Sequence, residues 1–403
     1  MLSHADVVDA SERIADLVRH TPLEHSSTFS AMTGASVHLK LETFQKTGAF
    51  KIRGAANRIR TLSDAEREAG VVTASAGNHA QGVALAASRS NVDATIVMPK
   101  HAAISKIEAT RGYGAEVIRH GVDYSEAQAR AREIQREEGR TYVHAFDDDA
   151  VMAGQGTIGL EILADLPEVD TVVVPIGGGG LIGGIATALK GANADVRVVG
   201  VQSEGASSVV ESLAKGAIYE RDGVDTIADG IATRRVGDRT FEVIESRVDE
   251  VVTVSDSEIA TALLYLLERG KILVEGAGAV APAALLAGAF EYDEGEVIVP
   301  LLSGGNIDLN VLTTVIVRGL VETGRYLRIR TVLVDRPGAL EMLAHVIASY
   351  DANINAIQHD RTSRNVAMSA AEVELDIETR GHEHVRELVE GLRDHGYEVE
   401  LLL

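Results

Sequence analysis

The sequence predicts an α/β fold, with a parallel sheet covered by helices on both faces, followed by a small βαββαβ domain. Short apolar runs alternate with helical segments through most of the chain, which is the order found in parallel α/β folds. The pattern changes near Gly324. The chain has 39 glycines and only 4% aromatic residues, and a core of small aliphatic residues suits strands that are buried on both faces.

Each predicted strand is a short apolar run, and helical segments with apolar residues at i, i+3 and i+4 follow these runs. The predicted strands are Gly70–Ala74, Asp93–Met98, Ala115–Arg119, Thr171–Ile176, Val196–Val201 and Glu296–Leu301. The predicted helices are Gly77–Ser88, Ser105–Tyr113, Tyr124–Glu138, Leu181–Lys190, Asp256–Arg269 and Ala279–Leu286. Ligands of such sheets bind at the carboxyl ends of the strands, so the loops that follow the strands are the places to look for chemistry.

The last segment reads as strand, helix, strand, strand, helix, strand, which is the order of a ferredoxin-like unit. Its elements are Tyr326–Val334, Gly338–Tyr350, Ile354–Asp360, Ala367–Ile377, Gly381–His395 and Tyr397–Leu402. We therefore expect two domains, residues 1–323 and 324–403, with a small subdomain of about residues 45–145 inserted in the first.

Composition excludes several classes of function. The chain has no cysteine, so disulfides, thiolate metal sites and catalytic thiols are impossible. The net charge of -22 argues against nucleic acid or an anionic membrane as partner. This acidity suits either a salt-rich cytoplasm or a generally acidic proteome. No segment reads as a signal peptide or a membrane span, so we expect a cytoplasmic protein.

Lys51 is the first candidate for chemistry, in the segment KLETFQKTGAFKIRG. It follows Phe50 and the small-residue turn Thr47-Gly48-Ala49. An apolar setting lowers the pKa of a lysine, because burial disfavours the ammonium form. The neutral amine can then form a Schiff base. Taken alone, the segment is equally typical of a surface lysine at a helix start.

The segment Thr73–Gly82, TASAGNHAQG, follows a buried strand and opens a helix. The open backbone N–H groups of such a helix start favour an anion, for instance a substrate carboxylate. Asn78 could also donate to a phenolate oxygen. The alternative is an ordinary strand-to-helix turn in which Ser or Asn caps the helix.

The segment Pro175–Gly184, PIGGGGLIGG, places four consecutive glycines between a strand and a helix. Glycine lets several backbone amides converge on a phosphate. Gly178, Gly180 and Gly183 also have the G-x-G-x-x-G spacing of a dinucleotide site. That reading needs an acidic residue at the end of the next strand, and Glu204 lies just beyond it. A nicotinamide-dependent dehydrogenase is therefore the alternative from another class.

A fourth segment, PLLSGGN, follows the strand that ends near Leu301. Its Ser303 offers a neutral hydroxyl at the carboxyl end of a strand. Alone, the segment is equally typical of a plain turn.

Together these segments resemble the fold type II pyridoxal-5′-phosphate (PLP) enzymes, the tryptophan-synthase-β-like group. Within that group the chain is most similar to the threonine dehydratase (threonine ammonia-lyase) family, with the serine racemases as near relatives. The resemblance runs from about residue 5 to 320. Six motifs occur in the order of the family, which makes the match specific: TGAFKIRGA, SAGNHAQGVA, HAFDDDAVMAGQGT, GGGGLIGG, TIADGIA and SGGN.

The resemblance implies a role for each motif. Lys51 would carry the cofactor covalently and act as the catalytic base, Asn78 would contact O3′ of the cofactor, and Ser303 would face the pyridine nitrogen. Phe50 would pack against the cofactor ring. The phosphate would be held by backbone amides of Gly177, Gly178, Gly179, Gly180 and Leu181. The substrate carboxylate would bind to a loop formed by Ser75, Ala76, Gly77, Asn78 and His79. The implied reaction converts L-threonine to 2-oxobutanoate and ammonia.

Three departures from related sequences are informative. Serine racemases carry Ser where Ala76 stands, and alanine has no proton to give, so racemisation is not expected. The racemase-type divalent site would need carboxylates near Gln202 and Ser208, so we expect no metal. Ala49 replaces the usual Ser before Phe-Lys, which removes a hydroxyl near the cofactor. A serine or hydroxyaspartate dehydratase or racemase remains the alternative within the same fold.

The C-terminal unit resembles an ACT domain, through Asp335–Leu340 and Ala352–Ile354. This resemblance implies an amino-acid effector site, for which isoleucine is the natural candidate, and pairing within a homodimer or homotetramer. The alternatives are a module that serves only for dimerisation, and a catalytically silent sensor of amino acids. Isoleucine biosynthesis and threonine catabolism are both compatible with the expected reaction.

Overall fold

The computed structural model describes residues 2–362 and 367–402. The chain forms two compact units, residues 1–308 and 309–403. Within the described residues, no helix is long and apolar enough to cross a membrane.

The first unit contains a six-stranded sheet in the order β1-β2-β10-β7-β8-β9. Its strands are β1 (Leu23–His25), β2 (Ser36–Leu41), β7 (Thr171–Pro175), β8 (Arg197–Ser203), β9 (Glu250–Val254) and β10 (Val297–Leu302). Only β1 pairs antiparallel, with β2, and the remaining pairs are parallel. The sheet is therefore mixed, and the carboxyl ends of its five parallel strands share one edge.

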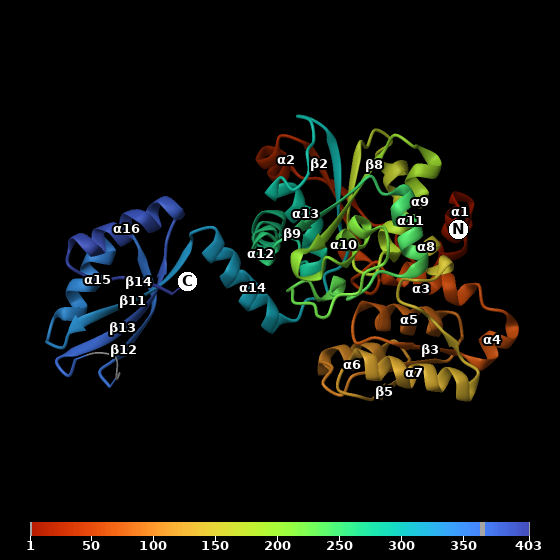
Figure 1. The fold of residues 1–403 in the computed structure, drawn as a ribbon, viewed down its shortest axis with the longest axis horizontal. Helices are drawn as coiled ribbons and strands as arrows, with labels where there is room; N and C mark the ends of the chain where they lie inside the picture. Colours follow the sequence, from red (N-terminus) through yellow and green to blue (C-terminus); the bar gives the residue numbers. More distant parts are fainter. Residues whose placement is uncertain (1, 363–366, 403) are drawn as a thin grey trace. The chain divides into compact units, whose positions relative to one another are not determined.

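Helices flank this sheet (Figure 1). They are α1 (His4–Ile14), α2 (Ser27–Thr33), α8 (Asp149–Asp165), α9 (Gly180–Ala192), α10 (Ser208–Lys215), α11 (Asp238–Arg247), α12 (Asp256–Tyr265) and α13 (Gly276–Ala287). Short helical turns are η1 (Glu42–Phe44), η2 (Glu204–Ala206), η3 (Asp229–Ile231) and the π-helical η4 (Leu266–Gly270).

Glycines let α8 and α9 approach closely. A Cβ atom on Gly184 would lie 2.1 Å from the carbonyl oxygen of Met152, and one on Gly156 would lie 2.6 Å from the carbonyl oxygen of Gly184. Side chains at these positions would force the helices apart. This contact fixes α9 and, with it, the glycine run at its amino end.

A second, four-stranded sheet lies in the sequence between β2 and β7. It is parallel throughout, in the order β5-β4-β3-β6, with β3 (Val71–Ala74), β4 (Ala94–Met98), β5 (Glu116–Arg119) and β6 (Thr141–Tyr142). Its helices are α3 (Lys51–Arg60), α4 (Asp64–Ala69), α5 (Asn78–Arg89), α6 (Ile104–Gly112) and α7 (Tyr124–Glu138). Its core is aliphatic and includes Ile52, Val83 and Ile96.

The second unit begins with α14 (Leu309–Glu322), which contacts β11. Then follow β11 (Tyr326–Val334), α15 (Ala339–Ser349), β12 (Asn353–Asp360), β13 (Ala370–Glu378), α16 (His382–Asp394) and β14 (Glu400–Leu401). The strands form an antiparallel sheet in the order β12-β13-β11-β14. One face packs on both helices through Ile329, Leu343, Leu375 and Leu388. This is the predicted βαββαβ order.

The predicted strands and helices agree with the structure within a few residues. The helix Tyr124–Glu138 and the strand Tyr326–Val334 agree at both ends. The strands β1, β2, β6 and β9 were not predicted, because each is short or mixes polar with apolar residues. The predicted helix Asp256–Arg269 changes to π-helical geometry at Leu266.

Candidate active site

The loop before Lys51 pairs with the loop that carries Ser303. The N–H group of Phe50 donates to the carbonyl oxygen of Ser303 (3.1 Å), and the N–H of Gly305 donates to the carbonyl of Gly48 (2.8 Å). Ala49 and Gly304 form an antiparallel bridge. Two segments 250 residues apart in the sequence are thereby joined at the carboxyl end of β10.

Lys51 is the first residue of α3. Its Nζ donates to the carbonyl oxygen of Ala145 (2.9 Å) and lies 5.1 Å from the ring centroid of Phe50. Burial lowers the pKa of the Lys51 ammonium to about 8, although the nearby Glu275 carboxylate opposes the shift. The amino end of a helix disfavours a cation as well. Roughly a tenth of this amine is therefore neutral and nucleophilic at pH 7, and about half at pH 8.

The glycine run joins β7 to α9. Gly179 has a left-handed backbone with φ of +93°, which favours glycine. A Cβ on Gly178 would lie 2.4 Å from the ring of Phe146, and one on Gly177 would lie 3.0 Å from Cα of Ile231. Larger residues therefore cannot occupy this loop, which leaves backbone amides as its principal polar groups.

The amino end of α9 completes this loop. The first N–H groups of a helix have no partner within it, and those of Gly180 and Leu181 open α9, while the Leu181 side chain is buried in the core. Backbone amides at the start of a helix, next to a glycine run, are suited to an anion such as a phosphate.

The segment Ser75–His79 joins β3 to α5. The N–H of Gly77 donates to Oγ of Ser75 (3.2 Å), and Ala76 packs against the apolar core that includes Ile52, Val83 and Ile96. His79 is buried, and Nε2 lies 3.0 Å from the carbonyl oxygen of Val143. Burial, assisted by the charge of Lys51, lowers the pKa of the His79 imidazole to about 3. A neutral imidazole of this kind holds the segment in place.

Asn78 and Ser303 present side-chain groups from two different loops. Asn78 donates from Nδ2 to Oε1 of Glu275 (2.7 Å), and its Oδ1 accepts from Nδ2 of Asn306 (2.8 Å). Ser303 is 3% exposed, and its Oγ donates to the carbonyl of Ala277 at the long distance of 3.4 Å. The hydroxyl remains able to accept or donate a further hydrogen bond.

Sequence reasoning assigned no role to four residues of this site, Ala145, Phe146, Glu275 and Asn306, although two of the six motifs contain all of them except Glu275. The first two contact Lys51 and the glycine run, and the last two hold Asn78. The one signal for Glu275 was its position, because it is an isolated acid before a helix of glycine, alanine and other apolar residues.

The side chain of Gln202 is hydrogen-bonded to backbone groups of residues 206–210. Oε1 of Gln202 accepts from the N–H groups of Val209 (2.8 Å) and Val210 (3.1 Å), and its Nε2 donates to the carbonyl of Ala206 (3.0 Å). The described residues contain no cluster of three or more His, Asp or Glu side chains able to hold a metal ion.

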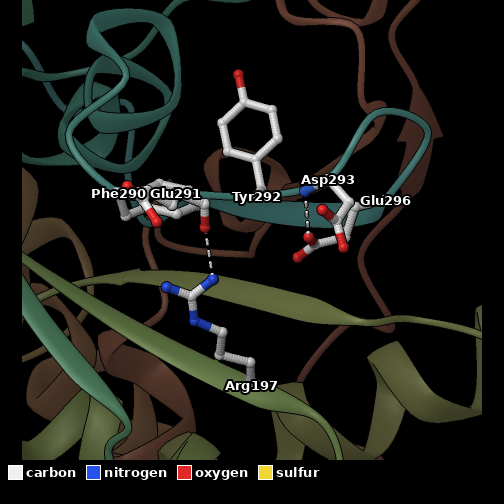
Figure 2. A pocket seen from close by; sticks show the side chains of 6 residues that line it. All are labelled: Arg197, Phe290, Glu291, Tyr292, Asp293 and Glu296. Carbon is white, nitrogen blue, oxygen red and sulfur yellow. Dashed lines mark hydrogen bonds between the residues drawn. The ribbon is translucent and has the colours of Figure 1, made fainter.

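A groove elsewhere in this unit is not part of the site. Figure 2 shows its lining at the amino-terminal ends of β8 and β10, the edge opposite the site. Arg197 donates to the carbonyl of Glu291 (2.6 Å), and Glu296 accepts from the N–H of Asp293 (2.9 Å). The groove residues are Arg197, Phe290, Glu291, Tyr292, Asp293 and Glu296. Their polar groups bond to one another and to neighbouring residues such as Glu250 and Thr171.

Comparison with known proteins identifies the class. Residues 14–304 match the family model of the pyridoxal-phosphate dependent enzymes, and the chain belongs to this family. An L-threonine ammonia-lyase from Thermotoga maritima is 47% identical over the full length of both chains.

Two solved structures are similar to this chain. Threonine deaminase isoform 2 from Solanum lycopersicum is 40% identical with a TM-score of 0.75, covering 77% of this chain and 86% of that chain. Maize serine racemase is 39% identical with a TM-score of 0.75, covering 78% and 96%.

The residues present fit the cofactor of this family. PLP needs an amine for its aldehyde, backbone donors for its phosphate and partners for its ring. An amine with a lowered pKa, a glycine loop in which a Cβ would clash, and a buried hydroxyl are all present. The chain is therefore a PLP enzyme, and the nicotinamide-dependent alternative is wrong.

Proposed function

We propose that this protein is an L-threonine ammonia-lyase, a PLP-dependent lyase of the cytoplasm. The observation that carries the proposal is the amine of Lys51, which has a pKa of about 8 and lies against the Ala145–Phe146 segment that packs on the glycine run. Full-length similarity to an enzyme of that name supports the choice of substrate.

The proposed roles follow from the chemistry of the side chains. When bound, PLP supplies an electron sink for the bond at Cα of an amino acid. Lys51 would hold the cofactor and then remove the Cα proton as general base. Backbone amides of residues 177–181 would hold the phosphate. Phe50 would pack on the ring of the cofactor. Asn78 would contact its O3′ atom, and Ser303 would face its pyridine nitrogen.

The loop of residues 75–79 would bind the substrate carboxylate, because it opens α5 with a small-residue turn. Loss of water across Cα and Cβ of L-threonine, followed by hydrolysis of the carbon–nitrogen bond, gives 2-oxobutanoate and ammonia. Ala76 has no group that could return a proton to Cα from the other side. The side chains therefore favour elimination over the racemase alternative. The reaction would serve isoleucine biosynthesis or threonine catabolism.

We further propose that residues 1–323 form the catalytic domain, with a small subdomain of about residues 45–145, and that residues 324–403 form a regulatory ACT domain. The β12-β13-β11-β14 sheet with two helices on one face supports the second assignment. An amino-acid effector such as isoleucine would bind there, and the enzyme would act as a homodimer or homotetramer.

The test is release of 2-oxobutanoate from L-threonine by the purified, PLP-loaded protein, with L-serine as the competing substrate and with or without isoleucine. We expect L-threonine to be turned over faster than L-serine, with isoleucine inhibiting. A protein that binds PLP yet releases no oxo acid from either substrate would disprove the proposed function. Formation of D-serine without oxo acid would favour the racemase.

A further inference from the structure

Glu275 lies where three parts of the site meet. It immediately precedes α13, and its N–H donates to the carbonyl oxygen of Gly304 (3.1 Å). A Cβ atom on Gly304 would lie only 2.4 Å from Oε1 of Glu275. The same Oε1 accepts the hydrogen bond from Asn78. The carboxyl therefore touches both the loop that carries Ser303 and the first residue of α5.

The hydrogen bonds determine which way the Asn78 amide points. Nδ2 of Asn306 donates to the carbonyl of Thr47 (2.7 Å), a group that can only accept. The same Nδ2 donates to Oδ1 of Asn78. Nδ2 of Asn78 must then face Glu275, where a carboxylate oxygen accepts from it. One of the two N–H bonds on this nitrogen is used, and the other remains for a ligand.

We propose that Glu275 is a positioning residue, which holds the Asn78 amide so that its second N–H stays directed at the phenolate oxygen of the cofactor. The inference deepens the proposed function and rests on the role proposed for Asn78. Glu275 acts through the hydrogen bond of Asn78 and does not itself touch substrate or cofactor.

The surroundings of Glu275 disfavour its charged form, so its hydrogen bond to Asn78 matters more than its charge. Burial raises the pKa of the Glu275 carboxyl, whereas Lys106 and the bond from Asn78 oppose the increase. Asp229 and Lys51 are the other charged groups that act on it. Lys106 is itself fixed, since its Nζ donates to the carbonyl of Asn306 (2.5 Å). A glutamine could therefore replace the acid and still accept from Asn78.

A double-mutant cycle on PLP binding tests the proposal. The dissociation constant is measured by titrating cofactor-free protein with PLP and following visible absorbance. We expect Glu275→Ala and Asn78→Ala each to weaken binding about tenfold, the effect of roughly one hydrogen bond. The double variant should bind no worse than Asn78→Ala, because Glu275 acts only through Asn78. Glu275→Gln should bind within about threefold of the wild type.

Two further variants serve as controls. Asp229→Asn removes another carboxylate near Lys106 but leaves the bond to Asn78, so it should not reproduce the loss. If Glu275→Ala does not fold, as judged by thermal unfolding, Glu275→Leu takes its place, because leucine fills more of the space and likewise offers no acceptor to Asn78. Its effect should also disappear in the Asn78→Ala background.

Additive losses, about a hundredfold in the double variant, would overturn the proposal. So would a Glu275→Gln protein as weak as Glu275→Ala, since charge rather than hydrogen-bond geometry would then be responsible. A wild-type protein that binds PLP but releases no 2-oxobutanoate would disprove the proposed function, and the cycle would still decide the role of Glu275.

Discussion

Two cationic side chains lie two residues apart on α3 and have opposite acid–base behaviour. Arg53 is completely buried, and burial alone would lower the pKa of its guanidinium, but Glu42 and Glu161 raise that pKa above its ordinary value. For Lys51, burial dominates and the pKa falls to about 8. The difference comes from the partners, because Arg53 meets two carboxylates at hydrogen-bond distance and Lys51 meets a carbonyl.

The Arg53 cluster satisfies every donor of the guanidinium. Nε and Nη2 bond to the carboxylate of Glu42 at 2.9 and 2.8 Å, and Nη1 reaches Oε1 of Glu161 at 2.6 Å. The buried Lys40 pairs with Glu161 at 2.7 Å. Thr157 and the carbonyl of Arg19 complete the set. This cluster joins α3, α8 and the end of β2, so it fixes the helix from which Lys51 projects.

The comparison shows how one helix can serve two purposes. A buried charge with complete partners is a fixed structural element, whereas a buried amine without a carboxylate partner at bonding distance is available for reaction. Substitution of Lys51 should therefore affect the reaction, whereas substitution of Arg53 or its partners should affect stability.

The largest effect is expected from Lys51→Ala. Without the amine, turnover of L-threonine should fall by about a thousandfold or more, and the visible absorbance of lysine-bound cofactor should disappear. The free energy of unfolding should change little, because Lys51 forms a hydrogen bond to a carbonyl and no salt bridge. Lys46→Ala, at an exposed position, is the control. Retention of turnover by Lys51→Ala would remove the basis of the proposed function.

Arg53→Leu should break the other half of the comparison. It leaves the buried Glu42 and the partly exposed Glu161 without their main partner, which costs about 3–5 kcal/mol of unfolding free energy. Urea unfolding of the cofactor-free protein measures the loss. Arg111→Ala, which removes an exposed ion pair with Glu108, should cost no more than about 1 kcal/mol. Equal costs at the two positions would contradict the assignment of Arg53 as a structural cation.

The pKa of Lys51 should also control how fast the cofactor-free protein takes up PLP. Only the neutral amine attacks the aldehyde, so the rate should fall about tenfold for each pH unit below about 8 and level off above it. Stopped-flow absorbance between about pH 6.5 and 9 records the profile. A rate that still rises steeply above pH 9 would mean that Lys51 behaves like an ordinary lysine.

The sequence was sufficient for features that depend on local pattern. Short apolar runs predicted β3, β4, β5, β7, β8 and β10, and the resemblance carried by six motifs implied the cofactor. The four unpredicted site residues depend on distant contacts. Glu275 and Asn78 are 197 residues apart, and nothing local distinguishes an acid that meets an amide from an acid that begins a helix.

The Arg53 cluster was missed for the same reason. Glu161 lies on α8, 108 residues from its partner, where an acid near the end of a helix reads as a solvated side chain. Strand β1 was missed because two of its three residues are exposed, so it has no apolar run. The specific roles of Lys51, the glycine run and Ser303 remain predictions, of which the Lys51→Ala variant tests the first.

A smaller effect is expected from Glu161→Gln, which tests how charge is shared within the cluster. Burial alone would raise the pKa of the Glu161 carboxyl, but Arg53 and Lys40 hold it below its ordinary value of 4.5. The folded state therefore binds this proton less readily than the unfolded state. Stability from Glu161 is present above the ordinary pKa and is lost as the pH falls through the lowered one.

Glutamine retains an acceptor for Arg53 but carries no charge, so we expect a loss of about 1–3 kcal/mol at neutral pH, less than for Arg53→Leu. Because the variant has no carboxyl to titrate at this position, its deficit relative to the wild type should shrink as the pH falls below about 4.5. Urea unfolding at neutral and acidic pH measures both quantities. A deficit that stays constant with pH would mean that Glu161 contributes through packing and hydrogen bonds, and that Glu42 alone supplies the charge that Arg53 requires.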